Sequence, residues 1–355
     1  MGNLMTCLNG GLRGLIAKTG KRAVLSGLAV AMSGVLGGGF LSVLPAAAEE
    51  GANGIEYAVQ SELATKTLLL DVADTGTRLI AVGEFGHVVY SDDRGETWTQ
   101  AETVPTQVTL TSVDFATDKV GFAGGHDTTI LKTVDGGVTW ERIYSDIAAE
   151  TPIMTLLFDS EMHGWAMGAF SFVVETNDGG ATWQSRPLVA DSEDDFHLNK
   201  AFRAKNGSIF VAAEFGTVYR SRDNGVTFEA IQTPYQGSFW GGMGVTDGSV
   251  LLYGMRGNVY RSADNGTTWT KVDAGTNKSF GGGRQLADGT VVLAGLNGAI
   301  AYSTDNGRGF TTVTRPDRLG YNAVVEGPAG SIVIFGEPGV KTMPASADAA
   351  AAAGS

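Results

Sequence analysis

One eight-residue stretch recurs six times along this chain, and its spacing constrains the fold more than any other feature. Its plainest copy, T-V-D-G-G-V-T-W, occupies residues 133–140. Every copy has an aspartate at its third position, and these aspartates are Asp93, Asp135, Asp178, Asp223, Asp264 and Asp305. They recur at steps of 41 to 45 residues, and roughly 40–45 residues is the length of one four-stranded propeller blade. The repeat therefore predicts an all-β chain built from such blades.

The octet itself predicts a tight hairpin turn. Ser or Thr ends one strand, and Asp with Asn-Gly or Gly-Gly turns the chain, because these residues tolerate left-handed backbone angles. Thr followed by Trp, in most copies, starts the next strand. The pattern resembles the Asp-box, or BNR repeat, of sialidase-type propellers. We expect the six aspartates to be structural, since no copy has the acidic ladder and distal Glu of a calcium loop; metal or sugar sites are the alternative.

Seven repeat units can be placed, each with an inner strand. The expected inner strands are residues 68–72, 110–115, 153–158, 198–203, 239–245, 280–286 and 321–325. The seventh unit has no octet and no outer strand, and an open sheet edge promotes aggregation. We therefore predict a seven-bladed β-propeller over residues 55–343, its last blade closed by an N-terminal strand at residues 55–59. Residues 344–355 are rich in Ala and are predicted to be a disordered tail.

Residues 1–48 have the features of a secretory signal peptide. They contain no acidic residue, and an apolar run at 23–44 leads to Ala46-Ala47-Ala48. Cleavage would leave a flexible segment at 49–54 and no membrane insertion. A retained anchor is the alternative, because the apolar run is nearly long enough to span a bilayer. Cys7, the only cysteine, would be removed, and export without disulfides fits a periplasm, or a thylakoid lumen in a photosynthetic host.

The charge balance excludes one class of partner. The chain has 25 Lys and Arg against 38 Asp and Glu, a net charge of −13, and four of the basic residues lie in the predicted signal peptide. A protein this acidic is poorly suited to bind nucleic acid or anionic lipid.

The loops of a propeller fall on two faces. The octets join third and fourth strands on one face, which we call the octet face. The second-to-third loops and the crossings between blades lie on the other, the crossing face, where propeller sites usually cluster. One position in each second-to-third loop varies among acidic, basic and other polar residues, and the candidates are Glu84, His126, Glu214, Arg256, Asn297 and Glu337. Turn chemistry alone would favour one residue type there, so the variation indicates a binding surface, with ordinary solvated turns as the alternative.

The crossings add further candidates to this face. Trp240 and Arg284 follow the later crossings, and the longest crossing carries the acidic run D-S-E-D-D at residues 191–195. Aromatic residues beside charges suit a peptide or protein partner. The alternatives to a binding role are a solvated loop for the acidic run and ordinary packing below the channel mouth for Trp240.

Catalytic chemistry has weak support. A sialidase needs an arginine triad, a nucleophile and an acidic proton donor, whereas Arg220 and Arg261 occupy a duplicated V-Y-R-S frame beside the octets. The four histidines are in different repeats, without the spacing of metal ligands. We expect no catalytic residue, metal or cofactor. A glycan-binding propeller or sialidase-like glycoside hydrolase is the alternative function.

The frame V-G-E-F-G-H-V-V-Y-S-D-D-R-G-E-T-W at residues 82–98, with the signal peptide and seven units, resembles the photosystem II stability/assembly factor family, including its relatives in non-photosynthetic bacteria. The resemblance covers residues 55–343. It implies a monomeric, non-enzymatic, exported propeller that binds a protein or peptide of a membrane or envelope complex and assists its assembly or stability. Photosynthetic members are similar to chaperones that use an arginine-containing patch, for which Arg256 and Arg284 are the nearest candidates.

Overall fold

The protein is described here from a computed structural model, which describes residues 54–190 and 192–353. The predicted signal peptide and residues 49–53 lie outside the described residues. No helix among the described residues is long and apolar enough to cross a membrane.

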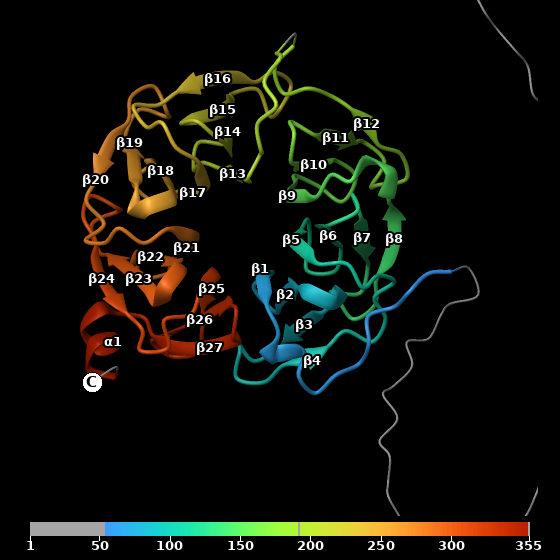
Figure 1. Cartoon of the computed structure of the whole chain (residues 1–355), viewed down its shortest axis with the longest axis horizontal. Coiled ribbons are helices and arrows are strands. Elements are labelled where there is room, and N and C mark those ends of the chain that lie inside the picture. The colour runs from blue at the N-terminus through green and yellow to red at the C-terminus, as the bar shows by residue number, and fades with distance from the viewer. Residues whose placement is uncertain (1–53, 191, 354–355) are drawn as a thin grey trace, which may run out of the picture. The chain divides into compact units, whose positions relative to one another are not determined.

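The described chain forms seven antiparallel sheets arranged around a central channel (Figure 1). Blade 1 contains β1 (Leu69–Asp74), β2 (Leu79–Gly83), β3 (Val88–Ser91) and β4 (Thr99–Gln100). Blade 2 contains β5 (Leu110–Phe115), β6 (Gly121–Gly125), β7 (Ile130–Thr133) and β8 (Glu141–Tyr144). Blade 3 contains β9 (Ile153–Phe158), β10 (Gly164–Gly168), β11 (Val173–Thr176) and β12 (Gln184–Ser185). Blade 4 contains β13 (Lys200–Arg203), β14 (Ile209–Ala212), β15 (Thr217–Ser221) and β16 (Glu229–Gln232).

The remaining blades continue the same order. Blade 5 contains β17 (Phe239–Gly244), β18 (Val250–Gly254), β19 (Val259–Ser262) and β20 (Thr270–Val272). Blade 6 contains β21 (Phe280–Gln285), β22 (Val291–Gly295), β23 (Ala299–Ser303) and β24 (Thr311–Thr314). Blade 7 contains β25 (Tyr321–Glu326), β26 (Ser331–Gly336) and β27 (Gly339–Pro344), and helix α1 (Ala347–Ala353) follows it. The predicted all-β, seven-bladed propeller is therefore confirmed.

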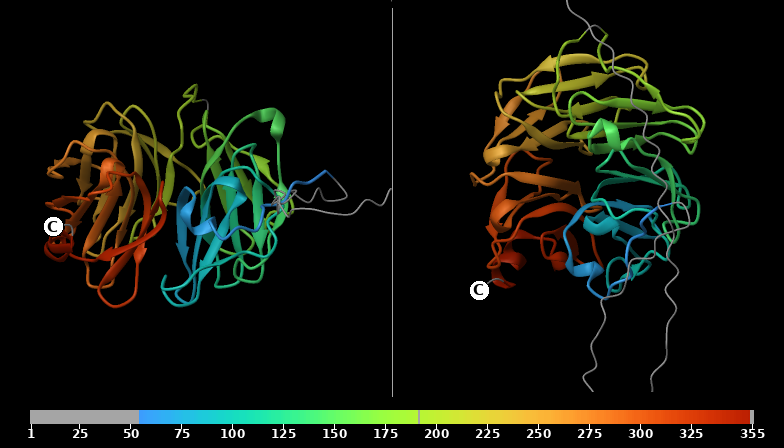
Figure 2. Two further views of the ribbon diagram at one scale, coloured as in Figure 1. Left: turned by 60° about the horizontal axis from the view of Figure 1, so that its bottom comes forward. Right: turned by 45° about the vertical axis from the view of Figure 1, so that its right-hand side comes forward.

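The core of the ring is distributed between blades rather than concentrated at one centre. Each of the seven buried hydrophobic clusters joins two neighbouring blades. The second strand of blades 1 to 6 is buried along its whole length, because a neighbouring blade covers each of its faces. This explains their continuous apolar sequence. The side view in Figure 2 shows the strands running between the crossing face and the octet face.

Each octet is a hydrogen-bonded turn held by its aspartate. In the first copy, Ser91 Oγ donates to Asp93 Oδ1 at 2.7 Å, and the backbone N–H of Thr97 donates to the same oxygen at 2.8 Å. The equivalent pair of bonds occurs at Asp135, Asp178, Asp223, Asp264 and Asp305. The described geometry thus gives every octet aspartate a set of bonds within its own turn.

The glycine of the octet fits the turn against the preceding blade. Gly225 has a φ of +85°, and a Cβ there would lie only 2.4 Å from the Trp165 ring of blade 3. A Cβ on Gly95 of blade 1 would likewise lie 2.7 Å from Val333 of blade 7. The octet therefore contributes to blade-to-blade packing as well as to its own hairpin.

Acid should weaken these turns. Hydrogen bonds from the Thr four residues on lower the pKa of the carboxyl groups of Asp93, Asp223 and Asp264 to about 2, below the value of about 3.9 in an unfolded chain. A depressed folded pKa gives stability that is present above the unfolded pKa and lost as pH falls through the folded pKa. We expect the melting temperature to fall as the pH is lowered from about 4 to about 2. The Asp223→Asn variant should have a lower melting temperature than wild type at neutral pH, and its melting temperature should fall less between about pH 4 and about pH 2. If the melting temperatures of both proteins fall by the same amount, other groups cause the loss of stability in acid.

Blade 7 is not closed by the N-terminal segment, so that part of the sequence prediction is wrong. Its sheet has three strands, β25, β26 and β27, among the described residues. Residues 55–59 instead lie against blade 1, where Ala58 N–H donates to Val104 O at 2.9 Å and Gln100 Nε2 donates to Val59 O at 2.9 Å. The fourth strand of blade 1 has only two residues, which leaves polar groups beside it for this segment to satisfy.

The first and last blades nevertheless pack directly against each other. Phe335 and Val333 of blade 7 share one buried cluster with Leu69 and Leu79 of blade 1. Trp98 contacts Phe335 edge to face, with ring centroids 5.5 Å apart, and Arg94 Nη2 donates to Glu326 O at 2.9 Å. Within residues 54–190 and 192–353, side-chain packing and not strand exchange joins the first blade to the last.

The predicted disordered tail is also corrected. Pro344 ends β27, and helix α1 packs against β24 and β27 (Figure 1). Ala350 of the helix is buried in the cluster that contains Tyr302 and Met343. Alanine has the highest intrinsic helix propensity, so a run that lacks the pattern of a strand can still form a helix once one face is covered.

Truncation after Pro344 should expose the edge that α1 covers. Helices that cover sheet edges limit association between edges. We expect the truncated chain to melt several degrees lower, since roughly 1 kcal/mol shifts the melting temperature of a domain this large by about 2 °C, and to elute partly as larger species. An unchanged melting curve with an unchanged elution volume would show that α1 does not protect blade 7.

Candidate functional site

The second-to-third loops of the crossing face share one turn. In blades 1, 5 and 6 this turn is a single 3-10 turn, Glu84–Gly86, Met255–Gly257 and Leu296–Gly298. Its middle residue has a left-handed backbone conformation, with φ between 52° and 59° in blades 1 to 6. The middle residues are Phe85, Asp127, Phe170, Phe215, Arg256 and Asn297. We call these the tip residues.

The tips show that the sequence prediction combined two structural positions. Arg256 and Asn297 are tips, and both are exposed. Glu84, His126, Glu214 and Glu337 precede the tip, where their equivalents in blades 5 and 6 are Met255 and Leu296. Counted from the Gly or Ala that begins each loop, Arg256 and Asn297 stand one residue further on than the other four, a difference that the sequence prediction did not separate.

The residues before the tip divide into two kinds. Glu84 and Glu214 turn back toward the chain: Leu68 N–H donates to Glu84 Oε1 at 2.9 Å, and His197 N–H donates to Glu214 Oε2 at 3.0 Å. Both glutamates thus anchor the backbone that enters the inner strand. His126 and Glu337 are exposed, and their side chains are accessible to a partner.

Three tips are exposed phenylalanines that the sequence prediction missed. Phe85, Phe170 and Phe215 are 56%, 57% and 60% exposed. Bulky side chains rarely adopt a left-handed backbone, and Asn or Gly satisfies the same turn in other proteins without exposing an aromatic ring. The available signal was the recurrence of Phe at the third position of a loop that begins with Gly or Ala.

Trp240 lies at the mouth of the channel. The register of β17 shifts between Phe239 and Gly241, so Trp240 is the extra residue. Similar shifts occur at Leu70, Thr111, Gly281 and Asn322. All five line the central cavity of about 550 Å³. The cavity therefore opens among these residues at the crossing-face ends of the inner strands.

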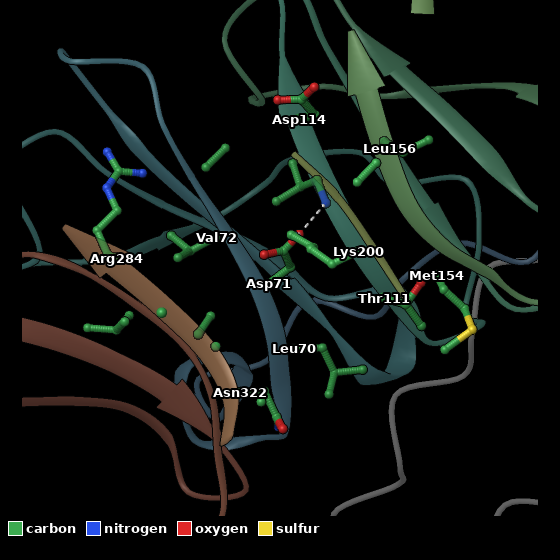
Figure 3. A pocket seen from close by; sticks show the side chains of 18 of the residues that line it. Leu70, Asp71, Val72, Thr111, Asp114, Met154, Leu156, Lys200, Arg284 and Asn322 are labelled. Atoms are coloured by element: carbon green, nitrogen blue, oxygen red, sulfur yellow. Dashed lines mark hydrogen bonds and ion pairs between the residues drawn. The ribbon is translucent and has the colours of Figure 1, made fainter. Parts of the chain in front are cut away.

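Deeper in the channel, one ion pair links blades that are far apart in sequence. Lys200 Nζ of blade 4 lies 2.9 Å from Asp71 Oδ2 of blade 1 (Figure 3). Asp114 lies nearby, and burial raises its pKa to about 6, although the Phe158 N–H donates to Asp114 Oδ2 at 2.7 Å and opposes that shift. The cavity is thus charged as well as apolar.

Arg284 is not part of the crossing face, which corrects the prediction. It lies near the far end of β21, and the guanidinium Nη2 is 3.3 Å from Asp74 Oδ2. Asp74 ends β1 and also pairs with Arg94 of the first octet, at 2.7 Å. Four residues of strand, at roughly 3.3 Å each, separate Arg284 from the start of its strand, so Arg284 and Arg256 do not form one patch.

Metal chemistry has no ready site in the part of the chain that the structure describes. Within residues 54–190 and 192–353, no group of three or more His, Cys, Asp or Glu side chains is arranged to hold a metal ion.

The fold and this face define a class, a propeller whose loops surround a channel mouth with variable charged and aromatic residues. Comparison with sequence families narrows the class. The family described as "Photosynthesis system II assembly factor YCF48" matches residues 143–289, and the BNR/Asp-box repeat matches residues 89–100. The resemblance expected from the sequence is therefore confirmed. A search of curated proteins found no match.

Solved structures give the same fold. "YCF48 bound to D1 peptide" aligns with a TM-score of 0.64 at 19% identity and covers 78% of this chain and 93% of that chain. "YCF48 from Cyanidioschyzon merolae" aligns with a TM-score of 0.60 at 15% identity, covering 81% and 97%. Virginiamycin B lyase from Staphylococcus aureus reaches 0.64 at only 10% identity, covering 79% and 95%. Since an assembly factor and a lyase align equally well, these likenesses identify the fold alone.

Proposed function

We propose that this protein is a non-enzymatic propeller that binds a peptide or protein segment on its crossing face and assists the assembly or stability of a membrane or envelope complex. The observation that carries the proposal is the set of exposed tips on that face, where aromatic and charged side chains surround the channel mouth. Interfaces are enriched in aromatic residues and arginine, which act as anchors at their centres.

Arg256 illustrates why these tips suit a partner. Its side chain is exposed, its backbone N–H donates to Ser279 Oγ at 3.1 Å, and its guanidinium has no ion-pair partner among the described residues. The turn therefore uses the backbone of Arg256 and leaves its charge available. Trp240 supplies a partly buried aromatic surface at the mouth.

The comparisons support the class of partner. The YCF48 family described as an assembly factor matches the central blades, and one solved YCF48 structure holds a D1 peptide. By analogy, the partner here is a segment of a membrane-complex subunit. We further propose an exported monomer that works in a periplasm, or in a thylakoid lumen in a photosynthetic host.

The glycosidase alternative conflicts with the positions of the arginines. Arg220 is buried and donates to Glu229 Oε1 at 2.7 Å, while Arg261 pairs with Asp247 at 2.6 Å and donates to Asn306 O at 3.1 Å. Both arginines stabilise the structure beside the octets through these ion pairs and hydrogen bonds. Neither is free to bind a substrate carboxylate at the channel mouth.

Substitution of Arg256 tests the proposal. Arg256→Glu should reduce capture of a specific envelope polypeptide by roughly tenfold, which corresponds to about 1.4 kcal/mol, without changing the melting curve. Arg222→Glu is the matched control, because Arg222 is also exposed but lies in an octet. The measurement is affinity capture from envelope extract, quantified by mass spectrometry. Equal capture by both variants would count against the crossing face, and hydrolysis of aryl glycosides without any capture would favour the alternative.

A further inference from the structure

An aromatic patch lies between blades 3 and 4 on the crossing face. We define it as the tips Phe170 and Phe215 together with Phe196 and His197 of the crossing. The ring centroids of Phe196 and Phe215 are 5.3 Å apart, and those of Phe170 and His197 are 5.0 Å apart. The two tips remain 57% and 60% exposed despite these contacts. The patch therefore presents two aromatic pairs to solvent.

Hydrogen bonds hold the patch in place on both sides. Ser171 N–H donates to Phe196 O at 2.8 Å, and Phe196 N–H donates to Ser171 Oγ at 3.1 Å, which joins the crossing to the blade 3 loop. His197 N–H donates to Glu214 Oε2 at 3.0 Å, which joins it to the blade 4 loop. A surface that is ordered before binding loses less conformational entropy when a partner docks.

The fold does not require phenylalanine at either tip. Phe170 and Phe215 have φ values of 56° and 52°, and the equivalent turn in blade 6 has Asn297 at 56°. Asn tolerates this backbone region well, whereas a bulky residue there is unusual. Each phenylalanine also exposes apolar surface to water. Both features are unfavourable for the isolated protein, and a partner that covers the rings would offset them.

The crossing that leads into the patch is acidic. Glu193, Asp194 and Asp195 directly precede Phe196 and are exposed, and Glu214 Oε2 accepts from the His197 N–H. The segments that build the patch, residues 168–171, 187–199 and 213–217, contain no Lys or Arg. Asp194 accepts from Ser192 Oγ at 3.0 Å, and Glu214 Oε2 lies 3.1 Å from His197 Nδ1. Glu193 and Asp195 form no ion pair with a Lys or Arg among the described residues, so the patch combines exposed aromatic rings with their negative charge.

We propose that this patch binds a peptide segment in which Lys or Arg stands next to apolar residues. The rings would accept the apolar side chains and the methylene stems of the basic residues, with cation–π attraction, while the carboxylates attract the positive charges and select against acidic segments. The inference rests on the proposed function and specifies the chemical class of the partner, a peptide with basic and apolar residues.

Two labelled probe peptides test the inference by fluorescence anisotropy with the full chain. One is a short peptide of Ser, Leu and Arg, and the other has Glu in place of every Arg. Wild type should bind the basic peptide at least tenfold more tightly than the acidic one, and added salt should weaken that binding. Both Phe170→Ala/Phe215→Ala and Glu193→Gln/Asp195→Asn should weaken it by about tenfold.

Val134→Ala is the control, because Val134 is also an exposed apolar side chain, 67% exposed, but lies in the octet of blade 2, on the face away from the acidic crossing. It should bind the basic peptide as wild type does, and melting curves establish that every variant is folded. Equal binding of both peptides, no binding of either, or an equal loss with Val134→Ala would overturn the inference. So would a wild-type dimer that Phe170→Ala/Phe215→Ala dissociates, since a second copy would then occupy the patch. Capture that depends on Arg256 would survive these failures and leave the proposed function standing.

Discussion

Replacement of Phe335 by alanine is expected to lower the free energy of unfolding by roughly 3–5 kcal/mol. Phe335 is fully buried where blades 1 and 7 meet, and its ring contacts Trp98 edge to face. Removal of the ring leaves a cavity at the junction that joins the ends of the propeller. Because no strand is exchanged between blades 7 and 1 among the described residues, packing at this junction is what keeps the ring closed. Urea denaturation measures the loss.

Deletion of residues 54–59 is the control for this account. The segment makes hydrogen bonds along blade 1 but contributes no strand to blade 7. We expect its removal to lower the free energy of unfolding clearly less than Phe335→Ala does and to leave the elution volume of the protein unchanged. If the deletion lowers the free energy of unfolding more than Phe335→Ala does, or causes aggregation, the N-terminal segment closes the ring after all.

Replacement of Trp240 by alanine is expected to weaken partner binding by about 2 kcal/mol, or roughly thirtyfold. Trp240 projects at a register shift of β17 and lines the central cavity at its mouth. A tryptophan that becomes fully desolvated at an interface is among the strongest anchors. Isothermal titration with the partner segment identified by affinity capture measures the change, and the melting curve reports any loosening of the mouth.

Trp183→Ala is the comparison for that measurement. Trp183 ends the octet directly before the last strand of blade 3 and packs against Phe158, with ring centroids 6.3 Å apart. Its loss should lower stability and leave the affinity of the folded protein unchanged. If Trp183→Ala weakens binding and Trp240→Ala does not, the partner binds at the octet face.

The repeat made most of the fold predictable, because each octet marks a turn, a strand on either side and a face. The ends of the chain lacked that marker. Blade 7 has no octet, so nothing in the sequence distinguished a missing strand from an edge covered by another element. The Ala-rich tail fits either a disordered segment or a helix until the apolar surface of blades 6 and 7 is known, and Ala350 packs on that surface.

The candidate site was predictable as a face but not residue by residue. The sequence prediction placed Glu84 and Arg256 at one loop position, although Arg256 stands one residue further from the Gly that begins its loop and adopts the left-handed turn conformation. Arg284 was assigned to a crossing, but β21 continues through it to the octet face. Phe170 and Phe215 were overlooked because an aromatic residue in a turn usually indicates packing, and only the structure shows that their rings are exposed.

Cross-linking from single positions tests the central claim, that a polypeptide partner binds the crossing face. Cys7 is the only cysteine, so a Cys7→Ser background allows one photoreactive label at a time. One label is attached at Arg256→Cys on the crossing face, and the other at Arg222→Cys on the octet face. The account predicts a covalent adduct with a specific envelope polypeptide from position 256 and none from position 222. Adducts from position 222 alone, or none from either position, would contradict it.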